Sequence, residues 1–181
     1  MQIHFLALSA SLILALNLGA CSPDQNWRDV SFEGSHLKAQ LPCKPDKTTR
    51  SVPLGGQPVD LKMVGCESGT AMVAVMTATL PAGADANAVM LGWQKATLNN
   101  ARVQPGQETG RQTWHRPGHL PLSASLRLQA PGLRANGEPV RMDALWGAVA
   151  EGDRVRLVHA VLYDSKIQPE MANTLFDGIK P

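Results

Sequence analysis

Short stretches in which apolar and polar residues alternate recur along most of this chain, separated by turns rich in glycine, proline or asparagine, and they predict β-strands. The clearest is 122–130, LSASLRLQA, where every second residue is apolar. The stretch 70–80, TAMVAVMTATL, is apolar on both faces, which is typical of a central strand covered on both sides. A chain with this pattern is constrained to build its core on a sheet.

Two segments break this period and predict helices instead. Asp85 is a good N-cap for 86–101, ANAVMLGWQKATLNNA, in which Trp93 lies at helical spacing and is expected in the core rather than in a ligand site. Near the end of the chain, Pro169 suits the first turn of a helix within 168–181. The order strands, helix, strands, helix predicts an α+β fold with a mainly antiparallel central sheet and helices packed on it.

Glycine-containing turns set the predicted hairpins. Gly55-Gly56 is typical of a two-residue turn, Asn136-Gly137 indicates a type I′ turn, and 151–153, Glu-Gly-Asp, predicts a third hairpin. Strands on either side of such short turns are expected to pair antiparallel.

The first residues form an apolar run that ends in a cysteine. Residues 5–18, FLALSASLILALNL, rise only about 21 Å as a helix, short of the roughly 30 Å of a bilayer core, so they suit a signal peptide covering 1–20. The sequence Leu-Gly-Ala-Cys that ends at Cys21 resembles the lipobox of bacterial lipoproteins. That resemblance implies a diacylglyceryl group on the Cys21 thiol, cleavage before it, and acylation of the new amine.

The residues after Cys21 complete this prediction. Ser22, rather than aspartate, implies sorting to the outer membrane, with the protein on its periplasmic face. Residues 21–26 would be the lipidated cysteine and its tether, and 27–181 have the length of a single globular domain. The n-region MQIH lacks Lys and Arg, and the alternative is a plain signal peptide followed by a coincidental cysteine.

The other two cysteines are predicted to form a disulfide, as expected in an oxidising periplasm. Pairing Leu54 with Gln57 across the glycine turn puts position 45 opposite Cys66, two residues from Cys43. The alternatives are a redox dithiol, which lacks the usual C-x-x-C, and a metal site, for which only one histidine lies close in sequence.

Composition and motifs argue against several functions. The net charge of +2 gives no nucleic-acid signature, and four Trp, three Phe and one Tyr are too few for a base-stacking platform. The arginine-biased stretch 102–156 fits a solvated face at least as well as an anionic partner. His159 in an apolar strand is expected to be packed rather than catalytic. No hydrolase elbow, zincin helix or phosphate loop occurs, so we predict no catalytic residue, no cofactor and no enzyme.

The stretch 114–119, WHRPGH, holds the most residues that could bind a metal or a partner. His115 and His119 are four residues apart, but a proline and a glycine between them make this a loop rather than a helix face. A metal bound by the two histidines is the weak candidate, and a surface loop is the ordinary one. Arg111, Trp114 and Arg116 are instead a possible partner contact, because Trp and Arg dominate interface hot spots.

Two long stretches together resemble PsbP-like domains: HLKAQLPCKPDKTTRSVPLGGQPVDLKMVGCESGTAMVAV from residue 36, and GEPVRMDALWGAVAEGDRVRLVHAVLYD with the final FDGIKP. The resemblance implies an α/β/α sandwich around an antiparallel sheet, and a role in binding other proteins without a shared active site. This chain departs from the family where Leu37 and Leu41 replace aromatic positions of the first strand.

These observations predict an outer-membrane-anchored periplasmic lipoprotein that acts as a non-catalytic protein-binding or accessory module. Its expected partners are the membrane, through the lipid, and an envelope protein. The alternative is an envelope protein that binds a small ligand or a metal in a cleft between sheet and helix.

Overall fold

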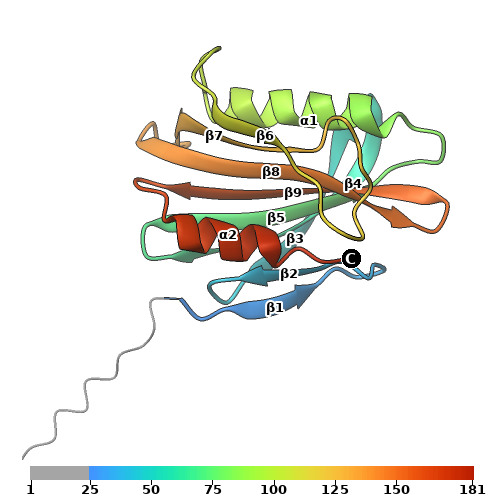
Figure 1. Ribbon diagram of the computed structural model, residues 1–181, viewed down its shortest axis with the longest axis horizontal. Helices are drawn as coiled ribbons and strands as arrows, with labels where there is room; N and C mark the ends of the chain where they lie inside the picture. The colour runs from blue at the N-terminus through green and yellow to red at the C-terminus, as the bar shows by residue number, and fades with distance from the viewer. Residues whose placement is uncertain (1–24) are drawn as a thin grey trace, which may run out of the picture.

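The computed structural model describes residues 25–181, and the predicted signal peptide and Cys21 lie outside this range. Its strands and helices follow one another as β1 Arg28–Ser31, β2 Lys38–Leu41, β3 Asp46–Leu54, β4 Gln57–Ser68, β5 Ala71–Thr79, α1 Ala86–Asn100, β6 Thr109–Thr113, β7 Leu126–Leu133, β8 Pro139–Glu151, β9 Arg154–Asp164 and α2 Pro169–Asp177. Seven strands form one sheet in the order β3-β4-β5-β9-β8-β7-β6, and β1 pairs with β2 in a separate hairpin (Figure 1). No helix in the described part of the chain is long and apolar enough to cross a membrane.

The predicted α+β class is wrong, because the protein is mainly β. Strands hold 48% of the described residues and helices only 15%. Two-residue turns join β3 to β4, β4 to β5 and β8 to β9, so the chain returns directly into the next strand at these points. It leaves the large sheet for a helix only after β5 and after β9. Two short helices cannot form the outer layers of an α/β/α sandwich. Extended or irregular chain covers the remaining parts of the two sheet faces.

The central strand and the helix starts predicted from sequence are confirmed. The strand predicted at 122–130 instead runs from Leu126 to Leu133, and β6 was not predicted. β5 lies inside the sheet between β4 and β9, as its apolar faces predicted. The Asp85 carboxylate accepts hydrogen bonds from the backbone N–H groups of Asn87 and Ala88, which caps α1. Pro169 begins α2.

The core has two parts, one on each face of the large sheet. On one face, Trp93 of α1 packs with Leu128 of β7 and Trp146 of β8, which confirms Trp93 as a core residue. On the other face, Phe176 of α2 packs with Leu145 of β8 and with the apolar side chains of the β1–β2 hairpin. The long central strands β8 and β9 therefore hold both parts of the core together.

The predicted disulfide is confirmed. Cys43 and Cys66 are bonded, with their Cα atoms 5.9 Å apart. The predicted register is also found, since Leu54 lies opposite Gln57 in the β3–β4 hairpin. The bridge holds the segment between β2 and β3 against β4, close to the point where the described chain begins.

Candidate functional site

The predicted contact formed by Arg111, Trp114 and Arg116 is wrong in its central residue. Trp114 is only 6% exposed and belongs to the core on the α2 face. The physical reason lies in β8, where Gly147 leaves a hollow in the sheet that the indole fills: a Cβ at Gly147 would lie 2.5 Å from the Trp114 ring. The two arginines are exposed, each in an ion pair, and the indole is not on the surface beside them.

The two histidines of the same loop do not form a metal centre. His115 is exposed, whereas the His119 ring packs edge-to-face against Trp114, with centroids 4.6 Å apart. Burial lowers the pKa of His119, which favours its neutral form. No group of three His, Cys, Asp or Glu side chains within residues 25–181 is arranged to hold a metal ion.

His159 is a core residue, as its apolar surroundings predicted. Its ring stacks on Trp146, with centroids 4.4 Å apart, and meets the edge of Trp93 at 5.4 Å. Nδ1 donates to the Leu145 carbonyl at 3.0 Å, so Nε2 is free to accept from the Thr97 hydroxyl at 3.4 Å. Burial lowers the pKa of His159 to about 4, so the ring is neutral and enclosed.

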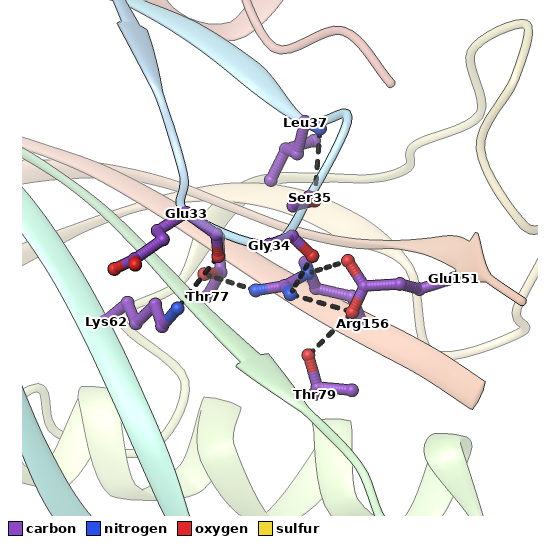
Figure 2. Close-up of polar contacts among 9 residues, drawn as sticks. All are labelled: Glu33, Gly34, Ser35, Leu37, Lys62, Thr77, Thr79, Glu151 and Arg156. Atoms are coloured by element: carbon purple, nitrogen blue, oxygen red, sulfur yellow. Dashed lines mark hydrogen bonds and ion pairs between the residues drawn. The ribbon is translucent and has the colours of Figure 1, made fainter.

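Most other polar groups inside the fold are committed to structural contacts. Figure 2 shows Arg156 lying between the Glu151 carboxylate and the backbone turn at Gly34. Arg156 Nε and Nη2 donate to Glu151 at 2.8 and 2.7 Å, Nη1 donates to Thr77 at 3.2 Å, and Nη2 also reaches the Gly34 carbonyl at 3.4 Å. The Thr79 hydroxyl donates to Glu151 at 2.8 Å. This network ties the β1–β2 turn to the sheet and leaves its charges paired.

A second buried pair, which the sequence did not predict, holds α2 on the sheet. Asp143 is fully buried and accepts two hydrogen bonds from Arg127, at 2.9 and 2.8 Å, and one from Gln129 at 2.8 Å. The Arg127 guanidinium also lies 4.6 Å from the centre of the Phe176 ring and donates to Asn173 of α2. The only sequence signal was the position of Arg127 and Gln129 on the polar side of an alternating strand.

Cations without a partner gather instead in an open groove of about 450 Å³ at one end of the molecule. Its walls come from the segment after α1, from the end of β7 and the start of β8, and from the start of the β9–α2 loop. The polar lining residues are Arg102, Gln104, Gln107, Arg141 and Ser165, and the lining contains no carboxylate. An adjoining hollow shares Arg141 and Ser165 and adds Lys166, again without a carboxylate. We call these two hollows together the cationic groove. A third hollow, which shares Ser165 but neither arginine of the groove, is lined by Glu67 and Glu138.

The charges of the cationic groove are not used elsewhere in the described fold. Within residues 25–181, neither Arg102, Arg141 nor Lys166 forms an ion pair. Asp164 lies opposite Arg141 in the β8–β9 register, but it is 4% exposed and accepts instead from Thr70 at 2.7 Å. The three cations are therefore available to an anion from outside.

Arg102 stands in this groove at a backbone position that favours glycine. It follows the last turn of α1 with φ of +54°, the only described non-glycine residue with positive φ. Its N–H bonds the Asn99 carbonyl, and the N–H of Val103 bonds the Leu98 carbonyl, which is the Schellman pattern of a helix end. A side chain in this conformation costs about 1 kcal/mol relative to glycine. An arginine is thus held, at a cost in stability, beside Arg141.

Comparison with known proteins adds no relative: no family model, no curated protein and no solved structure matches this chain. The likeness to PsbP-like domains therefore stays a prediction, and the functional argument rests on the residues of the site.

Proposed function

We propose that this protein is a lipid-anchored, non-catalytic binding module of the bacterial periplasm, attached to the outer membrane through Cys21, which takes an anionic ligand into the cationic groove. The observation that carries the binding role is a groove lined by Arg102 and Arg141 with no carboxylate among its lining residues. Guanidinium groups hydrogen-bond carboxylates and phosphates in a bidentate manner, so either anion suits the site.

The distribution of polar groups supports binding rather than catalysis. Two separate hydrogen-bonded pairs, Arg156 with Glu151 and Arg127 with Asp143, hold the fold together. His159 is enclosed by two tryptophans. A nucleophile and a base must face a reacting group together, and these buried groups face core side chains. The exposed cations of the groove need only attract and hold an anion.

The anchor is tested by intact mass spectrometry of the protein purified from membranes of its host. We expect a triacylated chain that begins at Cys21 and gains two hydrogens on reduction of the Cys43–Cys66 bridge. An unacylated chain that still carries Cys21 would contradict the anchor and leave the groove untouched.

The groove is tested by following backbone amide NMR signals during titration with two probes, inorganic phosphate and a short poly-glutamate peptide. We expect the largest shifts at Arg102, Gln107 and Ser165 for the probe that binds. Shifts centred on the exposed ion pairs of Arg111 and Arg116, or no saturable shift with either probe, would contradict the proposed site.

A further inference from the structure

The cationic groove lies at the end of the molecule where the described chain begins. β1 begins at the end where β7 turns into β8 and where β9 leads to α2 (Figure 1). The Asn26 N–H donates to the Pro42 carbonyl at 2.8 Å, and the adjacent Cys43 is bonded to Cys66 near the end of β4. The start of the described chain is thus fastened at this end by a hydrogen bond and a disulfide.

The tether is short compared with the size of the domain. From Cys21 to Gln25 the chain has four peptide steps, which span at most about 14 Å when fully extended. An acylated Cys21 lies at the membrane surface, so the end of the domain nearest to Gln25 is kept close to the lipid headgroups. The groove is on that end.

We propose that the cationic groove binds the phosphate of an anionic phospholipid headgroup in the membrane that holds the lipid anchor. The proposal rests on the anchor and the anion site proposed above. Arg102 and Arg141 would contact the phosphate oxygens, and Lys166 would add a further charge beside them. The domain would then hold one orientation, with this end on the membrane, and would not reorient freely on its tether.

Two features favour a headgroup over an acidic protein segment. The tether keeps the start of the described chain within about 14 Å of the anchor, so phospholipid phosphates are always near this end of the domain. The groove also combines its cations with apolar lining from Pro131, Leu133 and Val140, which suits the boundary between headgroup and hydrocarbon.

The test uses the mature chain with Cys21→Ser, which keeps every described residue but carries no acyl group, in cosedimentation with vesicles. We expect binding to vesicles of equimolar phosphatidylglycerol and phosphatidylcholine, and none to pure phosphatidylcholine. Arg102→Gly and Arg141→Gln are each expected to lower the partition coefficient about fivefold, as for the loss of one basic residue near an anionic surface. Arg102→Gly relieves the positive φ, so the fold is preserved.

The matched control is Arg154→Gln, which removes the same charge from an exposed arginine at the opposite end of the sheet, beside the β8–β9 turn. Partition unchanged in this variant supports the proposal. Equal losses in all three variants would overturn it, because they would indicate a nonspecific effect of net charge.

The remaining outcomes separate this inference from the proposed function. If phosphatidylglycerol vesicles do not bind but poly-glutamate shifts the groove amides, the headgroup is wrong and the groove serves an acidic protein segment. If free inorganic phosphate binds as tightly as the vesicles do, the site takes a soluble phosphate ligand and the headgroup proposal is again overturned. If no probe binds, both proposals fail.

Discussion

Arg102 lowers the stability of the fold but adds a positive charge to the cationic groove. Its backbone has the left-handed conformation that closes α1, and its side chain lines the cationic groove. Substitution Arg102→Gly is expected to raise the free energy of unfolding by about 1 kcal/mol, because glycine adopts positive φ without steric cost. Urea denaturation measures this change. Arg141→Gln, at an ordinary backbone position in the same groove, should leave stability nearly unchanged. A destabilised Arg102→Gly variant would mean that the arginine holds the fold together.

The buried pair of Arg127 and Asp143 contrasts with the surface pair of Arg116 and Asp177. Asp143→Ala leaves the Arg127 guanidinium, which is 17% exposed, without its carboxylate, and is expected to cost about 3 kcal/mol of unfolding free energy. Arg116→Ala should cost less than about 1 kcal/mol, since both partners of that pair are more than half exposed to water. Urea denaturation compares the two variants. Equal costs would show that Asp143 does not hold α2 on the sheet.

For individual helices and turns, sequence patterns predicted the structure correctly where it depends on the segment's own residues. The cap at Asp85, the start of α2 at Pro169 and the hairpin turn at 55–56 are set by local backbone chemistry, and each was predicted. The prediction of an exposed Trp114 in the loop at 114–119 was wrong, because the position of Trp114 depends on a hollow left by Gly147, which is far away in the sequence.

The disulfide is also an element-scale feature, because it links the chain before β3 to β4. Replacing both Cys43 and Cys66 by serine is expected to lower the free energy of unfolding by about 3 kcal/mol, as for a loop of this size in the chain-entropy account; the bonded residues are 23 positions apart. Thermal or urea unfolding measures the loss. Wild-type protein under reducing conditions should match the double variant, whereas Cys21→Ser should unfold like the wild type. Full stability after reduction would contradict the expectation.

At the scale of the whole molecule, the enclosed His159 makes stability depend on pH. Its pKa is about 4 in the fold and 6.5 in an ordinary environment, so the unfolded chain binds a proton more readily. Stability is therefore complete above about pH 6.5 and is lost as the pH falls toward 4. His119, whose pKa burial also lowers, contributes in the same direction.

This group alone is expected to cost about 2 kcal/mol of unfolding free energy between about pH 7 and pH 5. Urea midpoints at the two pH values measure the loss, and NMR titration of the His159 ring measures its pKa directly. A His159 ring that titrates near its ordinary pKa would contradict the assignment.

Most strands, the hairpin turns at 55–56 and 151–153, the two helices and the disulfide could be predicted from the sequence, because they follow from alternation, capping and turn residues within single elements or hairpins. The type I′ turn predicted at Asn136-Gly137 is not found, since only Gly137 of the two has positive φ. It also indicated a lipidation motif at Cys21, which lies outside the described residues. That the fold is mainly β became clear only in the tertiary structure, because local patterns do not show which segments cover the two faces of the sheet. The burial of Trp114, the pairing of Asp143 with Arg127 and the gathering of Arg102, Arg141 and Lys166 in one groove could not be predicted, because each of these contacts joins residues far apart in the chain.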